Sequence, residues 1–163
     1  MSVDKRRLRF AGALAVAMAL IGSAPALGAP ARLVVPPAAF HPSDGTDVWD
    51  NGGSSLRGAG DFLAPLALPP GAQITKVTLF ATDFNPSMTM FLTLVKATPK
   101  SAGGSNMATI ATIGSEHDPR TFSTTAIVGN PIGPASAAYL RATIPSQSDS
   151  LILWGALVLY TTP

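Results

Sequence analysis

The chain has 163 residues, carries a formal net charge of +2, and is only 12% charged, whereas soluble proteins average about 25%. Four of its eleven Lys and Arg residues and one of its nine Asp and Glu residues lie before residue 29, which leaves seven cations and eight acids, a formal charge of −1. The charge balance therefore gives no support for nucleic acid or an anionic lipid surface as a partner, and the absence of cysteine excludes disulfides, thiolate metal sites and cysteine nucleophiles.

The first segment of the chain has the order of charge and hydropathy found in secretory signal peptides. A basic cluster at residues 5–9 precedes the apolar run Phe10–Ile21, and small residues follow. The apolar run is shorter than the roughly 20 residues that a membrane-spanning helix needs. We therefore expect residues 1–28 to be a cleaved signal peptide and residues 29–163 to be one domain, secreted, periplasmic or on the cell surface, with no integral membrane segment after cleavage.

After residue 28 the chain alternates short β-branched and apolar runs with turns rich in Gly, Pro, Asn and Ser. Residues 41–60 are expected to be irregular, with one brief strand around Val48. The expected strands are, in chain order, residues 32–35, 62–68, 73–83, 88–95, 107–113, 122–128, 137–144 and 151–160. About eight strands with Gly and Pro connections predict an all-β fold, a single antiparallel β-sandwich for which a jelly roll is one suitable topology.

Three of these runs carry more specific predictions. Pro65 cannot donate a hydrogen bond to a neighbouring strand, so residues 62–68 are expected at an edge. Residues 73–83 and 88–95 are joined by a connection too short for a parallel crossover, so they are expected to form an antiparallel hairpin.

The last run, residues 151–160, is apolar on both faces. Such a strand is either central in a covered sheet or buried in a contact between subunits. The C-terminal strand is therefore also a candidate surface for self-association.

Several motifs resemble a group of secreted bacterial β-sandwich domains of unknown function. The group has a VPxxxF start, an LPxGAxVT strand entry, an Asp-Asn turn and an LxLxGVxxxY C-terminal strand. The corresponding pieces here are Val35–Phe40, Leu68–Ala72, Asp83–Asn85 and Leu151–Tyr160. The resemblance implies a secreted β-sandwich, and it carries over no catalytic residue.

The segment HPSDGTDVWD contains the densest group of polar side chains. Asp44, Asp47 and Asp50 could supply the oxygen ligands that Ca²⁺ prefers, although their spacing differs from that of an EF-hand loop. Asp-Gly and Asp-Asn-Gly sequences are also ordinary turn formers. A calcium site and solvated turns are therefore alternative interpretations of the three aspartates.

Two histidines, His41 and His117, lie close to acidic residues. A histidine beside a carboxylate can act as a general base or as a metal ligand. The sequence has neither a G-x-S-x-G nor an S-x-x-K nucleophile motif. A small secreted hydrolase or cyclase remains an alternative only if the fold brings the two histidines together.

Aromatic side chains on the polar face of a strand can stack against sugar rings. Phe80 and Tyr139 have such positions in their runs, so they are the candidate ligand-binding pair. Taken together, the sequence favours an exported non-enzymatic β-sandwich that acts as a binding, structural or surface-associated module able to self-associate. A carbohydrate-binding module is the first alternative, with a glycan as partner, and no catalytic residue is assigned.

Overall fold

The computed structural model describes residues 28–45, 47–99, 104–114, 116–146 and 149–163, so the expected signal peptide lies outside the described residues except for its last position. None of the described residues forms a helix that is long and apolar enough to cross a bilayer. The elements are β1 (Ala31–Val35), the 3-10 turn η1 (Pro37–Ala39), β2 (His41–Pro42), β3 (Val48–Asn51), β4 (Leu56–Leu66), β5 (Gln73–Asp83), β6 (Phe91–Ala97), β7 (Ser105–Ala111), β8 (Glu116–Thr124), β9 (Ala137–Ile144) and β10 (Leu151–Thr161).

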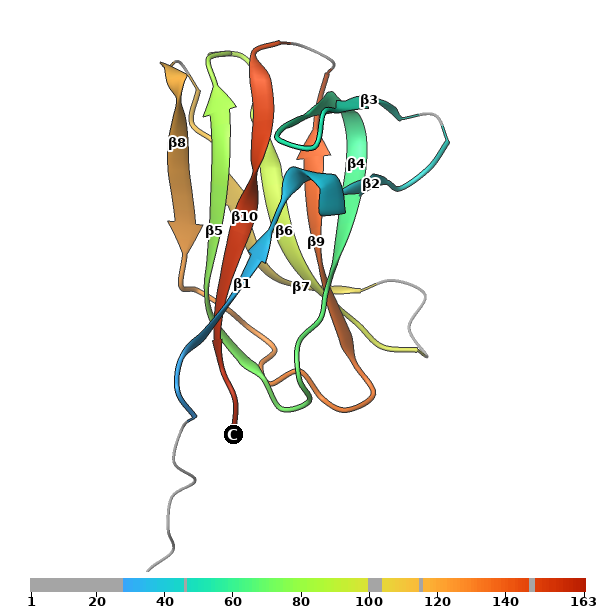
Figure 1. Ribbon diagram of the computed structural model, residues 1–163, viewed down its shortest axis with the longest axis vertical. Coiled ribbons are helices and arrows are strands. Elements are labelled where there is room, and N and C mark those ends of the chain that lie inside the picture. The colour runs from blue at the N-terminus through green and yellow to red at the C-terminus, as the bar shows by residue number, and fades with distance from the viewer. Residues whose placement is uncertain (1–27, 46, 100–103, 115, 147–148) are drawn as a thin grey trace, which may run out of the picture.

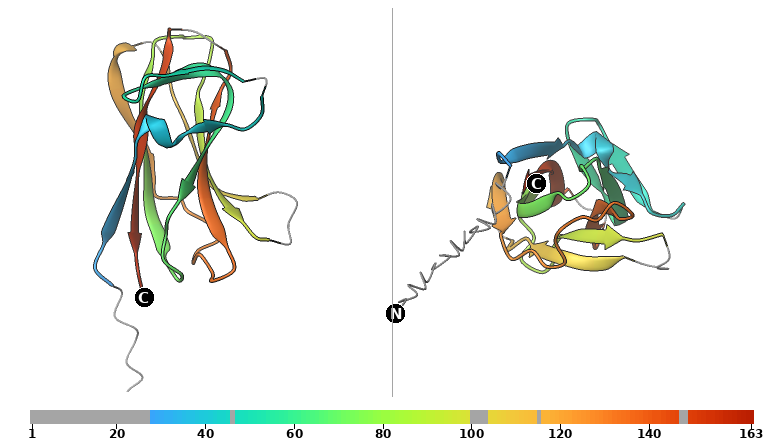
Figure 2. Two further views of the ribbon diagram at one scale, coloured as in Figure 1. Left: turned by 45° about the vertical axis from the view of Figure 1, so that its right-hand side comes forward. Right: turned by 90° about the horizontal axis from the view of Figure 1, so that it is seen from below.

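The strands form a nearly closed antiparallel β-sandwich, which confirms the expected fold class (Figure 1). Sheet A contains β1, β10, β5 and β8, with β3 and the first residues of β4 at its upper end. Sheet B contains β2, the rest of β4, β9, β6 and β7. Because β4 belongs to both sheets, the strand order runs continuously from β7 through β6, β9, β4, β10 and β5 to β8 (Figure 2).

Alternation of apolar and polar residues decides which side of each strand faces the core. In β9, Ala138, Leu140, Ala142 and Ile144 are buried, and the residues between them point outward. The same alternation in β5 places Val77, Leu79 and Ala81 in the core. The two inner faces thus pack against each other and form the single apolar core that the sequence predicts.

The C-terminal strand β10 is central in sheet A, between β5 and β1. Its inner residues, which include Leu151, Leu153 and Val158, are fully buried in the core. Its pairing with β5 is interrupted by a bulge at Gly155, where φ is +127° and an added Cβ would lie 2.8 Å from the Val35 carbonyl oxygen. Glycine is therefore required there both by the backbone conformation and by the close approach of β1.

The expected hairpin between residues 73–83 and 88–95 is wrong. β5 pairs with β10 and β8 in sheet A, and β6 pairs with β7 and β9 in sheet B. The connection between them is long enough to carry the chain from one sheet to the other. A short connection excludes a parallel crossover, but it does not require the two strands to pair.

The expectation of an edge strand around Pro65 is correct only locally. β4 as a whole lies between β9 and β10 in the strand order. At Pro65, however, β4 pairs only with β9, because its pairing with β2 is confined to Phe62 and Leu63. The proline thus occupies a part of β4 whose other side needs no donor.

Candidate functional site

The outer face of sheet B presents polar and aromatic side chains in cross-strand register. Asp61, Thr143 and Phe91 form one row across β4, β9 and β6. Arg141 and Thr93 lie in the next row, and Tyr139 lies in the row after that. We call this surface the platform, made of Asp61, Phe91, Thr93, Tyr139, Arg141 and Thr143.

Arg141 is at the centre of the platform. Its neighbours in β9, Leu140 and Ala142, are fully buried, so the arginine side chain points outward. Its Nε is inaccessible to solvent and has no hydrogen-bond partner among the described residues. No ion pair of Arg141 with any described residue is present either. The side chain as a whole is half-buried, so Arg141 places a cation at the surface of the platform, although its enclosed Nε cannot itself reach a ligand.

Two aromatic residues stand on either side of Arg141 along the strand direction. Phe91 is 41% exposed, and Tyr139 is half-buried. They are four residues apart in register, which corresponds to about 13 Å along the strands. Gly104 approaches the Tyr139 hydroxyl so closely that an added Cβ would lie 3.3 Å from it, so the β6–β7 hairpin bounds the platform next to this tyrosine.

The hydroxyl groups of the platform are held in place by side-chain hydrogen bonds. Thr143 donates a hydrogen bond from its hydroxyl to Asp61 Oδ1. The hydroxyls of Thr93 and Thr109 lie 3.4 Å apart. The platform thus offers a cation between two aromatic rings, with the Asp61 carboxylate and the Thr143 hydroxyl in the row of Phe91. Thr93, which is 4% exposed, lies buried beneath this surface.

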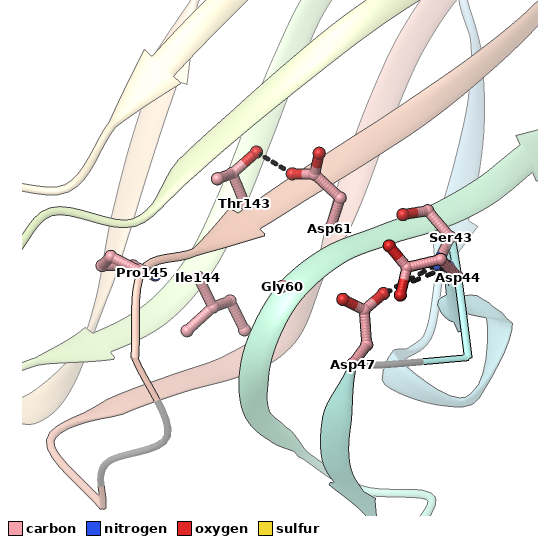
Figure 3. Close-up of a pocket in the computed structure, with 8 residues that line it drawn as sticks. All are labelled: Ser43, Asp44, Asp47, Gly60, Asp61, Thr143, Ile144 and Pro145. Atoms are coloured by element: carbon pink, nitrogen blue, oxygen red, sulfur yellow. Dashed lines mark hydrogen bonds between the residues drawn. The ribbon is translucent and has the colours of Figure 1, made fainter.

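At its upper end the platform opens into a shallow pocket of about 390 Å³ (Figure 3). The residues that line it are Ser43, Asp44, Asp47, Gly60, Asp61, Thr143, Ile144 and Pro145. In Figure 3, Asp61 and Thr143 face each other across β4 and β9, and Asp44 and Asp47 lie together in the loop before β3. Three carboxylates therefore border this end of the platform.

Asp47 organises the loop that forms one wall of the pocket. Its Oδ2 accepts hydrogen bonds from the backbone N–H of Ser43 at 3.0 Å and of Asp44 at 3.3 Å. Its Oδ1 lies over Gly60, where φ is +128° and an added Cβ would be only 1.9 Å from that oxygen. Gly60 therefore allows the loop to close onto β4.

Replacing Gly60 by alanine is expected to lower the free energy of unfolding by about 1–3 kcal/mol, since a left-handed backbone conformation strains a residue with a Cβ. The new methyl group must also displace the Asp47 carboxylate from its hydrogen bonds. Gly52→Ala is the matched control, because an added Cβ there meets nothing within 4 Å. Urea unfolding of both variants measures the difference, and equal losses would contradict this role of Gly60.

The structure does not bring Asp44, Asp47 and Asp50 together. Asp44 and Asp47 share the pocket, but Asp50 lies on β3, opposite Arg57 of β4. The Asp47 carboxylate is occupied by backbone N–H groups, as in an ordinary turn. Within the described ranges, no group of three or more acidic or histidine side chains is placed to hold a metal ion.

Phe80 and Tyr139 do not form one surface. Phe80 is on β5 of sheet A and Tyr139 is on β9 of sheet B, and each points away from the core. The two rings therefore lie on opposite faces of the sandwich. The partners that share a face with Tyr139 are Phe91 and Arg141.

The two histidines are also far apart. His41 is on β2 beside β4, and His117 is at the start of β8, on the opposite side of the sandwich (Figures 1 and 2). Residues 116–121, which lie between two of the expected strands, are in fact part of β8. The His117 ring stacks on Phe84, with the ring centroids 4.4 Å apart. Neither histidine lines the pocket beside the platform.

Alternation in residues 137–144 predicts that Arg141 and Thr143 share the outward face of Tyr139, but only the tyrosine was a candidate ligand-binding residue. The available signal was a single arginine in a strand that is otherwise uncharged. The sequence could not show that Phe91 and Asp61 lie beside Arg141, because this depends on which strands flank β9.

The chain matches no protein-family model and no curated protein. One similar solved structure contains the CBM22-1–GH10 modules of endo-1,4-beta-D-xylanase 10B from Clostridium thermocellum, in complex with xylohexaose. The alignment covers 84% of this chain and 28% of that chain, at 11% identity and a TM-score of 0.52. The CBM36-1 domain of a multidomain xylanase from the Trinervitermes trinervoides hindgut metagenome aligns over 82% of this chain and 98% of its own, at 13% identity and a TM-score of 0.49. The Eiger TNF of S. frugiperda aligns over 81% and 85%, at 10% identity and a TM-score of 0.42. At 11% identity, the likeness to the C. thermocellum modules shows a shared β-sandwich fold alone.

Proposed function

We propose that this chain is an exported, non-enzymatic β-sandwich module that binds a neutral glycan on the platform of sheet B. The observation that carries the proposal is the outward, half-buried Arg141 between Phe91 and Tyr139 on one face of sheet B, with no ion-pair partner among the described residues. Export rests on the pattern of residues 1–28, as in the secreted bacterial domains that the chain resembles.

The chemistry of the platform is complementary to sugar hydroxyls. Arg141 can only donate hydrogen bonds and ionised Asp61 can only accept them, whereas a hydroxyl does both. Phe91 and Tyr139 supply apolar faces for sugar rings on either side of these groups.

The balance of charge on the platform favours a neutral ligand. Asp44, Asp47 and Asp61 border one end, and Arg141 occupies the centre. A polyanionic glycan would meet repulsion from the three carboxylates. The C. thermocellum xylanase modules of similar fold were solved with xylohexaose, so this oligosaccharide is the first neutral probe.

Arg141→Met is expected to weaken binding by at least about tenfold, because hydrogen bonds to charged groups contribute about 1.5–3 kcal/mol. Methionine keeps an aliphatic stem against the sheet, so the fold is retained. Calorimetric titration with xylohexaose, followed by an array of neutral and acidic glycans, measures the affinity.

Phe80→Ala and Tyr139→Ala are the matched pair for this experiment, because each removes one aromatic ring from a different face. Tyr139→Ala is expected to weaken binding several-fold, and Phe80→Ala to leave it unchanged. Failure of the unmodified protein to bind any glycan, or loss of binding only in Phe80→Ala, would overturn the proposal.

A further inference from the structure

The outer face of sheet A is apolar in its middle and differs from the platform in this respect. Val34, Leu157 and Thr78 lie in one row across β1, β10 and β5. Phe80 lies in the next row, opposite Gly155. We call this surface the apolar strip, made of Val34, Phe80, Trp154, Leu157 and Leu159.

The exposure of the apolar strip is high for side chains of this kind. Val34 is 65% exposed and Trp154 is 36% exposed, while Phe80, Leu157 and Leu159 are half-buried. Trp154 donates a hydrogen bond of 2.9 Å from its Nε1 to the Thr82 hydroxyl on β5. A rigid aromatic anchor among aliphatic residues is typical of the centre of a protein interface.

Charged residues lie at the two ends of the apolar strip and have opposite signs. At the lower end, Arg32 and Lys76 flank Leu159. At the upper end, Asp50 is exposed on β3, beside the ion pair between Arg57 and Asp149. Because that ion pair is neutral overall, Asp50 leaves the upper end with an unbalanced negative charge.

We propose that the apolar strip is the interface of a symmetric homodimer. The two-fold axis lies in the interface, perpendicular to the strands, and passes near Gly155. Rotation about it brings the lower end of one copy's strip over the upper end of the other copy's strip, with β1 and β3 of both copies on the same side. Arg32 of one copy then faces Asp50 of the second copy, and Val34 and Leu157 pack against the partner's Trp154 and Phe80. Such a contact is self-complementary, as two-fold symmetry requires.

The dimer proposal does not depend on the proposed glycan function, but the dimer would affect how glycans are bound. In each copy, sheet B with its platform lies on the far side of the sandwich from sheet A (Figure 2), so the two platforms would lie away from the shared interface. The dimer would therefore present two glycan sites that face away from each other. Such a bivalent module would bridge separate polysaccharide chains.

Sedimentation of the purified protein over a range of concentrations tests the proposal, with a dimer expected for the unmodified chain. Val34→Glu and Asp50→Arg are each expected to raise the dissociation constant by at least about tenfold. Val34→Glu places an unpaired carboxylate in an apolar contact, and Asp50→Arg opposes the partner's Arg32 with a like charge. Combining Asp50→Arg with Arg32→Asp is expected to restore the dimer, because the charges are exchanged but remain complementary.

Phe91→Ala, on the other sheet, is the control and is expected to leave the dimer unchanged. A monomer at every concentration, or a dimer unaffected by both single variants, would overturn the proposal. If Val34→Glu does not fold, as judged by far-ultraviolet circular dichroism, the charge-exchange pair at the exposed Arg32 and Asp50 decides the question. Glycan binding is measured separately on monomer and dimer, so failure of one proposal is distinguishable from failure of the other.

Discussion

Replacing Asp83 by alanine is expected to lower the free energy of unfolding by about 2–4 kcal/mol, because each buried polar group that loses its partner costs about 1–3 kcal/mol. Asp83 is only 3% exposed, and Thr112 is 2% exposed. The Thr112 hydroxyl donates to Asp83 Oδ2, and the backbone N–H of Asn85 donates to Oδ1 at 3.1 Å. The substitution leaves both donors without an acceptor and opens a small cavity between them.

The hydrogen bonds of Asp83 connect the two sheets. Asp83 ends β5 in sheet A, and Thr112 directly follows β7 in sheet B. The Thr112 hydroxyl also accepts the backbone N–H of Met90 at 2.9 Å, just before β6 begins. The connection that replaces the expected hairpin is therefore fixed by one carboxylate and one hydroxyl, and the loss on substitution is a loss of contact between the sheets.

Asp149→Ala is the control for this prediction, because it makes the same change at the surface. Asp149 is 89% exposed and pairs with Arg57 at 2.9 Å. Exposed ion pairs contribute about 0–1 kcal/mol, so the two variants should differ clearly in the midpoint of urea unfolding. Equal losses would show that the Asp83 hydrogen bonds do not stabilise the fold.

Strands with clean alternation could be predicted, because alternation is a local property of the sequence. The expectation of an irregular stretch at residues 41–60 is wrong where β4 begins at Leu56, and the strand expected at residues 122–128 is β8 at Glu116–Thr124. Gln73–Asp83 and Ala137–Ile144 have the bounds that the sequence predicts. Strand pairing is not local, since it depends on which sheet each connection reaches. The path after Asp83 depends on its contact with Thr112, which is far away in the sequence.

The same limit explains which parts of the candidate site were predictable. Alternation placed Tyr139 and Arg141 outward on one strand. It could not show that β4 and β6 flank β9, so Asp61 and Phe91 were not joined to them. It also could not separate Phe80 from Tyr139, because two strands with polar outer faces can belong to either sheet. Candidate sites that combine residues from several strands therefore require the register.

Replacing Phe40 by alanine is expected to lower the free energy of unfolding by about 3–5 kcal/mol, the usual loss for a fully buried phenylalanine. Phe40 is 0% exposed although it lies between η1 and β2, outside the regular strands. Its backbone N–H donates to the Pro37 carbonyl at 3.0 Å, so the turn that follows β1 directs the ring into the core. Phe91→Ala is the matched control, since that ring is 41% exposed and its removal leaves no cavity. Urea unfolding of both variants measures the difference, and a small loss at Phe40 would mean that the segment Val35–Phe40 covers the core without stabilising it.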